Sequence, residues 1–367
     1  MSALYVHIPF CDKKCFYCSF AVSVGQKART KKYLECLNEE SKKYSNQKIE
    51  TIFIGGGTPT LLQAKELKIL FDHLNQNFDL SNVDEITIEA NPEGLTKKKL
   101  SALKECGVSR ISLGVQTLNE KYLKYLGRIH NKQQIYDAYD LIRNDGFDNV
   151  SLDLMFGFPD QTIGQLEEDV KAICELGSTH LSLYALTIDP KSRFFTKGVQ
   201  LQSQDEQAEK YAYIIKTLPQ YGFHQYEVSN FSKEGFESLH NIKYWQCEDY
   251  IGLGMGAHSF VDGKRFSNVE RLTEYIKMID ENQLAVIDEQ SINQVERLSE
   301  ALIFGLRMNR GINLGKLEQR FNQKLQEGQL IKLKQFVDGG LIEVQDQVYK
   351  VTDQGRMVLD TISAELI

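Results

Sequence analysis

Short apolar runs alternate with longer amphipathic stretches over the first half of the chain. Six runs have the length and composition of buried strands, at residues 4–8, 51–54, 85–89, 110–115, 150–155 and 180–186. Between them, apolar residues recur at helical spacing near residues 31–43, 64–75, 97–105, 133–144 and 164–175. This alternation predicts an α/β fold of repeated βα units around a parallel sheet, either a barrel or a doubly wound sheet. In both architectures functional residues gather at the carboxyl ends of the strands.

The pattern changes after residue 186. A long helix is expected near residues 204–220, followed by a Gly- and aromatic-rich segment, 226–260, which we interpret as a connector or an additional layer. From residue 292, apolar helices lead to a hairpin at 341–344 and 348–351 and then to a last helix. We therefore expect three parts: a core of residues 1–230, a connecting segment 231–290 and a smaller, winged-helix-like α+β module 291–367.

Charge and composition narrow the class of protein. The 367 residues carry 43 Lys and Arg against 50 Asp and Glu, a net charge of −7, which is the wrong sign for a protein whose main partner is nucleic acid. The winged-helix-like module is neutral, with ten residues of each sign between positions 290 and 367, and so lacks a DNA-binding footprint. No apolar run reaches the length of a membrane span, and the N-terminus has no signal-peptide pattern. We expect a cytoplasmic protein.

Three of the seven cysteines lie within eight residues, directly after the first predicted strand. Cys11, Cys15 and Cys18 have the spacing C-x3-C-x2-C, which can hold three irons of a [4Fe-4S] cluster and leave the fourth iron open to a bound molecule. A zinc site is the alternative, with His7 as the fourth ligand, but His7 lies inside the apolar strand. The odd cysteine count and the clustering argue against a disulfide framework.

Further polar and glycine residues mark the ends of the later strands. Gly55-Gly56-Gly57-Thr58 ends the second strand, where the absence of Cβ atoms lets the backbone approach a ligand, although such a turn is equally often only a turn. Glu89, Gln116 and Asp153 lie at other strand ends. A carboxylate there is costly unless paired, so these residues meet either a ligand or a structural ion-pair partner. Arg128 could grip a carboxylate through both guanidinium nitrogens.

Together these motifs resemble the radical S-adenosylmethionine (SAM) superfamily. Within it, Tyr5-Val-His-Ile-Pro-Phe-Cys and the spacings through Glu89, Gln116, Arg128 and Asp153 are similar to the oxygen-independent coproporphyrinogen III oxidase family, over almost the whole chain. The resemblance implies a partial (β/α)6 TIM-like barrel whose cluster, reduced by an electron donor, binds S-adenosylmethionine and cleaves it to a 5'-deoxyadenosyl radical.

The resemblance also implies which residues bind the cofactor. Residues that match those around a first S-adenosylmethionine are Tyr5, Gly56 and Glu89. Residues that match those around a second molecule, found in the true oxidases, are Tyr17, Gly57, Thr58, Gln116, Arg128, Asp153 and Ala185. No catalytic side chain is assigned.

Two departures from the oxidases point to the haem chaperone branch of the family. The true oxidases have a further cysteine where this chain has Phe20, and a long extension before the first cysteine. By contrast, the segment from His240 to Trp245 matches the H-N-x-x-Y-W motif of the chaperones, which implies His240 as a ligand of haem iron, with Cys247 as a competitor. A second Gly-rich segment, 252–257, is expected to line the cofactor cavity near His258.

The expected function is therefore that of a haem chaperone that binds haem and S-adenosylmethionine and passes haem to haemoproteins. The alternative is a genuine oxidase that decarboxylates coproporphyrinogen III in porphyrin biosynthesis, so the sequence leaves open whether the protein is an enzyme. A winged-helix regulator with a redox cluster is a third hypothesis, which the neutral module disfavours. Homodimerisation and peripheral contact with a membrane also stay open.

Overall fold

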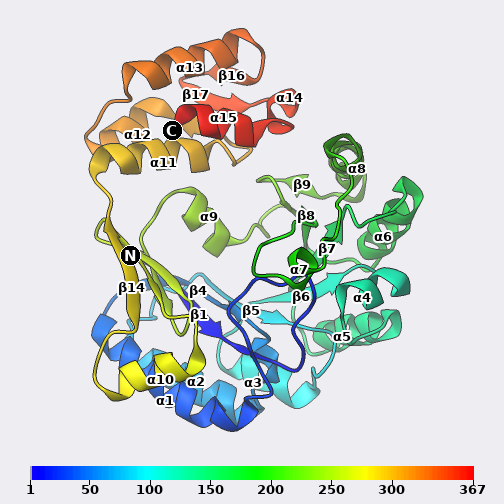
Figure 1. The fold of residues 1–367 in the computed structure, drawn as a ribbon, viewed down its shortest axis with the longest axis vertical. Coiled ribbons are helices and arrows are strands. Elements are labelled where there is room, and N and C mark those ends of the chain that lie inside the picture. The colour runs from blue at the N-terminus through cyan, green and yellow to red at the C-terminus, as the bar shows by residue number, and fades with distance from the viewer. Residues whose placement is uncertain (1) are drawn as a thin grey trace.

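Six parallel strands alternate with helices across the central sheet, as the sequence predicted (Figure 1). The computed structural model describes residues 2–367. The strands, in order across the sheet, are β1 (Ser2–Ile8), β4 (Ile49–Gly56), β5 (Glu85–Ala90), β6 (Arg110–Gln116), β7 (Asn149–Phe156) and β8 (His180–Ala185). The sheet does not close on itself, because β1 and β8 each pair with a further strand on their outer sides. The expected partial (β/α)6 barrel is confirmed.

Helices cover the outer face of these strands (Figure 1). They are α1 (Thr30–Ser41), α2 (Ala64–Asn77), α3 (Lys97–Glu105), α4 (Glu120–Leu126), α5 (Lys132–Asn144), α6 (Ile163–Glu175) and α8 (Gln204–Thr217). Helix α5 shows why these stretches are helical: Ile135, Ala138, Tyr139 and Ile142 are buried at spacings of three and four residues. Its first turn is closed by a capping box formed with the side chain of Asn131.

Residues 224–291, which include the segment interpreted as a connector or additional layer, carry strands that extend the same sheet. On the β8 side these are β10 (Asn230–Ser232) and β9 (His224–Gln225); on the β1 side they are β11 (Tyr250–Leu253), β12 (His258–Val261), β13 (Lys264–Asn268) and β14 (Val286–Ser291). Only β11 is parallel to its barrel neighbour, β1; the strands beyond it are antiparallel. Two helices belong to this part, α9 (Leu239–Trp245) and α10 (Leu272–Asp280). The sheet of 12 strands therefore includes most of this segment.

A small C-terminal domain follows β14 and lies apart from the barrel helices (Figure 1). It consists of α11 (Gln294–Gly305), β15 (Ile312–Asn313), α12 (Leu314–Phe321), α13 (Glu327–Asp338), β16 (Ile342–Gln345), β17 (Val348–Val351), α14 (Asp353–Arg356) and α15 (Leu359–Leu366). The predicted hairpin is present as β16–β17, with Asp346 and Gln347 both in the left-handed region that a tight turn requires. The domain has its own apolar core, centred on residues such as Leu302, Leu333 and Ile362.

Short elements shape the loop at the carboxyl end of β1. Strands β2 (Phe10–Cys11) and β3 (Ser23–Val24) pair in parallel and close a loop that contains all three clustered cysteines. Helix α7 (Arg193–Thr196) packs against this loop, where Phe194 N donates to Phe16 O at 2.9 Å. Single turns of 3-10 helix occupy residues 27–29, 42–44, 59–61 and 218–221.

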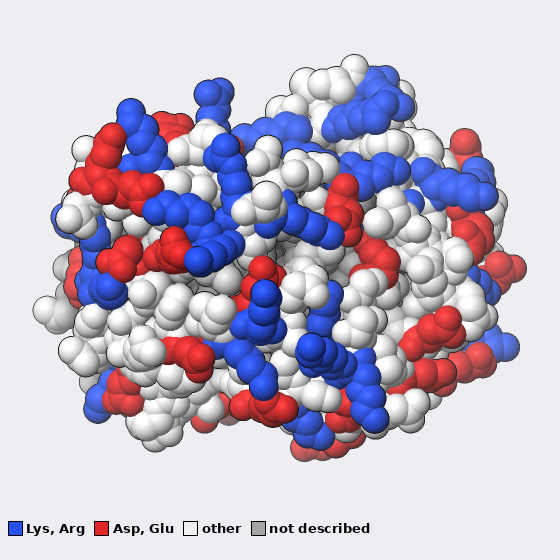
Figure 2. All heavy atoms as spheres, turned by 90° about the horizontal axis from the view of Figure 1, so that it is seen from below, with Lys and Arg blue, Asp and Glu red and all other residues white. Residues whose placement is uncertain are grey.

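Basic and acidic side chains intermingle on the face that carries the barrel helices (Figure 2). This mixture reflects the similar numbers of basic and acidic residues in the chain. Within residues 2–367, no helix has both the length and the apolar character needed to cross a bilayer.

Candidate functional site

The three clustered cysteines line a cavity of about 140 Å³ at the carboxyl ends of the barrel strands. Arg128 Nη1 lies 3.6 Å from Cys15 Sγ, and Thr58 Oγ1 lies 3.7 Å from Cys11 Sγ. Burial raises the pKa of the Cys11 thiol to about 12 and also raises the pKa of Cys18. Without a bound metal these groups are therefore thiols. Metal binding would release their protons, and the adjacent guanidinium would stabilise the resulting negative charge.

The glycines at the end of β4 lie against the cysteine loop. A Cβ on Gly57 would stand 2.7 Å from Phe10 O, and one on Gly56, whose φ is +114°, would stand 2.6 Å from the ring of His7. The N–H of Gly57 donates to Ile8 O and that of Thr58 to Phe10 O, both at 2.8 Å. These glycines are therefore required because the chain packs closely on itself, and the N–H groups of Gly57 and Thr58 bond within the chain.

Two half-buried carboxylates face the same cavity. Burial, followed by the charge of Asp153, raises the pKa of Glu89 to about 8, although Gly56 N donates to Glu89 Oε2 at 3.0 Å. Burial also raises the pKa of Asp153 to about 6, and Ser112 Oγ donates to it at 3.0 Å. Neither carboxylate has an ion pair within 4.0 Å among residues 2–367. Half-buried acids without an ion-pair partner in a cavity fit a ligand that brings hydroxyl or ammonium donors.

Arg128 lines this cavity and has one N–H donor without a partner among the described residues. Its Nη2 donates to Asn91 Oδ1 at 2.6 Å and to Gly114 O at 2.9 Å, whereas its buried Nε has no partner among the described residues. Gln116 adopts a φ of +68° at an irregularity in the β6–β7 pairing, and its Oε1 accepts from Tyr184 O–H at 2.8 Å. Backbone strain of this kind clusters at functional sites.

The structure brings most of the predicted cofactor residues together. The 140 Å³ cavity is lined by Cys11, Cys15, Tyr17, Cys18, Gly56, Gly57, Thr58, Glu89, Gln116, Arg128 and Asp153. Tyr5 lines a neighbouring cavity, and Ala185 at the end of β8 lines neither. Asn91 and Tyr184 were missed by the sequence analysis, although both stand at strand ends, which was the signal that could have found them.

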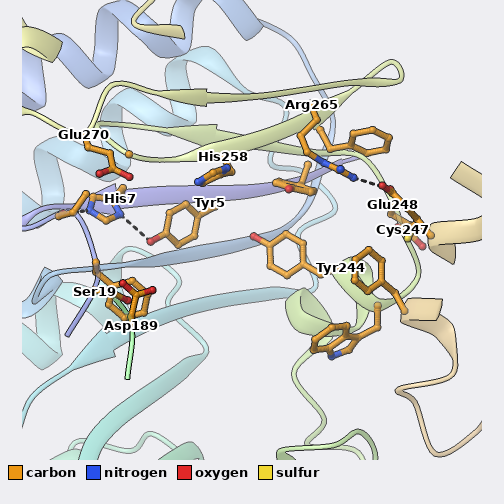
Figure 3. A pocket seen from close by; sticks show the side chains of 18 of the residues that line it. Tyr5, His7, Ser19, Asp189, Tyr244, Cys247, Glu248, His258, Arg265 and Glu270 are labelled. Carbon is orange, nitrogen blue, oxygen red and sulfur yellow. Dashed lines mark hydrogen bonds and ion pairs between the residues drawn. The ribbon is translucent and has the colours of Figure 1, made fainter. Parts of the chain in front are cut away.

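The neighbouring cavity is larger, about 610 Å³, and lies where β1, α9 and β11–β13 meet α11 of the C-terminal domain (Figure 3). Its walls are rich in aromatic side chains: Tyr5, Phe20, Tyr244, Trp245, Tyr250, Phe260 and Phe304. Phe20 lines both cavities, so the two are adjacent. The larger cavity thus suits a flat apolar molecule next to whatever the cysteines bind.

His240 does not line either cavity. Its ring is fully buried in the first turn of α9, where Nδ1 bonds with Thr51 Oγ1 and Nε2 with Tyr244 Oη, both at 2.9 Å. Burial lowers its pKa to about 3, so the ring is neutral. Ligation of iron by His240 would require one of these hydrogen bonds to break. Its motif partners Tyr244 and Trp245 do line the larger cavity, together with Cys247.

Comparison with known proteins identifies the family of the chain. Residues 5–224 match the family described as "Radical SAM superfamily", and residues 292–358 match the "HemN C-terminal domain". The chain belongs to the radical SAM superfamily. It is 37% identical to the "Heme chaperone HemW" of Bacillus subtilis (strain 168), over 98% of this chain and 97% of that protein, and 35% identical to its counterpart from Lactococcus lactis, over 96% and 94%. Within the superfamily, the chain is a member of the HemW family.

A solved structure has the same fold. The coproporphyrinogen III oxidase HemN of Escherichia coli, described as a radical SAM enzyme, superposes with a TM-score of 0.88 over 99% of this chain and 89% of that chain, at 24% sequence identity. The likeness covers both the open barrel and the C-terminal domain.

Proposed function

We propose that the protein binds haem and delivers it to haemoproteins, and that it keeps a [4Fe-4S] cluster and an S-adenosylmethionine site beside the haem. The observation that carries this proposal is the 610 Å³ aromatic cavity that adjoins the cysteine-lined cavity. Relatives named as haem chaperones, with 35–37% identity over nearly the whole chain, support the same function.

The residues of the smaller cavity fit the two cofactors. Cys11, Cys15 and Cys18 would ligate three irons. Glu89 and Asp153 are unpaired acceptors for hydroxyl or ammonium groups, and the unpartnered Nε of Arg128 is a donor for a carboxylate. When bound, the cluster supplies the electron that cleaves S-adenosylmethionine. We also propose that Tyr5, Gly56 and Glu89 serve a first cofactor molecule, and that the other predicted residues, with Ala185, serve a second.

Partners and location follow from this function. We propose a cytoplasmic protein that takes electrons from a separate donor and hands haem to acceptor haemoproteins. We propose residues 1–230 as the cofactor domain, 231–290 as the segment that contributes the haem-binding motif, and 291–367 as the C-terminal domain.

A haem titration combined with an anaerobic turnover assay tests the proposal. The protein with its cluster intact is titrated with haem, and a parallel sample receives coproporphyrinogen III, S-adenosylmethionine and a chemical reductant. We expect saturable haem binding and no protoporphyrinogen. Formation of protoporphyrinogen with methionine and 5'-deoxyadenosine would contradict the chaperone proposal and favour the oxidase.

A further inference from the structure

The larger cavity offers one free imidazole to a metal ion. Of the seven histidines in the chain, His7 and His258 line it. The ring nitrogens of His7 bond with Tyr5 Oη at 3.0 Å and with the carbonyl of Ala21 at 2.8 Å. His258 is exposed, and neither of its ring nitrogens bonds with any group of residues 2–367. Figure 3 shows it beside Tyr5, with no dashed line to its ring.

The position of His258 is fixed although its ring is free. It begins β12, which is held by pairing with β13 on one side and by β11 on the other. The carbonyl of His258 would lie 2.1 Å from a Cβ at position 252, so Gly252 allows β11 and β12 to lie unusually close. A ligand on a rigid strand can hold a metal without reorganising the chain.

Cys247 is the competing ligand in this cavity. Its side chain is half-buried and packs against the apolar core of the C-terminal domain. The ring of His258 is exposed and has no hydrogen-bond partner among the described residues. This difference in access favours the histidine.

Aromatic side chains and charges around His258 fit a porphyrin. Tyr5, Tyr244 and Phe260 all line the cavity, and Figure 3 shows Tyr5 beside His258. The rings would contact the flat faces of a macrocycle. Lys191 and Arg265 are the cations of the lining, paired with Glu270 and Glu300 at 2.6 Å each. Propionate groups would compete with these glutamates for the cations or remain in solvent.

We propose that His258 is the axial ligand of the haem iron in this cavity, and that His240 is a positioning residue that holds Tyr244 against the macrocycle through their hydrogen bond. The inference rests on the proposed function, since it names the site at which haem would be bound. It also gives the H-N-x-x-Y-W motif a physical role that does not require its histidine to leave the protein interior.

A haem titration of variants tests the ligand. The full-length protein is titrated anaerobically and followed by absorption and electron paramagnetic resonance, with the variants His258→Ala, His258→Cys and, as a matched control, His224→Ala, an exposed histidine outside the cavity. We expect His258→Ala to weaken binding by more than about 10-fold, because even outer-shell partners of a metal ligand contribute 10-fold or more. Added imidazole should restore the bound spectrum, and His258→Cys should give a thiolate-type spectrum. His224→Ala should behave as the unmodified protein.

The outcomes separate this inference from the function. Unchanged haem affinity and spectrum in His258→Ala would overturn the ligand assignment but not the proposed function. The same holds if added imidazole restores the bound spectrum of His240→Ala and not that of His258→Ala. Under the inference, His240→Ala weakens binding but keeps the histidine-type spectrum. If the unmodified protein takes up no haem, the proposed function fails and the ligand assignment fails with it. Circular dichroism and iron content of each variant identify any loss of fold or cluster.

Discussion

Glu89 makes the stability of the cofactor-free protein depend on pH. Its folded-state pKa is about 8 against an ordinary value of 4.5, because the side chain is largely removed from solvent. The folded protein therefore keeps the proton over a pH range in which the unfolded chain has lost it, so stability falls as pH rises from about 4.5 toward 8. At 1.36 kcal/mol per pKa unit, the fall between pH 5 and pH 7.5 is about 3 kcal/mol.

The variant Glu89→Gln removes this proton linkage and keeps the shape of the side chain. Urea unfolding followed by circular dichroism, on cofactor-free protein at pH 5 and pH 7.5, measures the free energy of unfolding. We expect the unmodified protein to lose about 3 kcal/mol more than the variant over this interval. Equal losses in both proteins would refute the reasoning, because Glu89 would then be ionised in the folded state.

Three further changes test the cavity. Cys15→Ala should remove bound iron and acid-labile sulfide from anaerobically purified protein, whereas Cys247→Ala should keep both; an unchanged iron content in the first variant would contradict the ligand assignment. Gly56→Ala should destabilise the fold by more than about 2 kcal/mol, because its Cβ would lie 2.6 Å from a histidine ring and its φ is positive. Gly328→Ala should not, because open space surrounds that position. Thermal unfolding of both variants measures the difference. Arg128→Lys should weaken S-adenosylmethionine binding about 10-fold in calorimetry, since a lysine cannot replace the guanidinium fork; equal affinity would remove Arg128 from the site.

The sequence predicted the barrel strands well because both faces of the parallel strands are buried. Every residue of β6 is buried, and so is every residue of β1 except Tyr5, which produces mainly apolar runs that can be recognised locally. The extension strands gave no such signal. Strand β14 is mostly exposed and β11 has only four residues, so their pairing depends on contacts with distant strands.

The sequence predicted those parts of the candidate site that lie at the carboxyl ends of strands. The cysteine loop, Glu89, Gln116 and Asp153 converge because parallel strands place their carboxyl ends at one edge of the sheet. The direction of a single side chain was not predictable. His240 and Tyr244 lie one turn apart on the same face of α9, yet only the longer side chain reaches the cavity. Similarly, His258 meets Tyr5 only because β11 and β12 join the barrel beside β1.

The central claim is that three cysteines near the N-terminus hold an iron–sulfur cluster beside a haem cavity. Metal and acid-labile sulfide analysis of anaerobically reconstituted, haem-free protein tests it most directly. The account predicts about four iron and four sulfide per chain. One zinc per chain, or iron without sulfide, would contradict it.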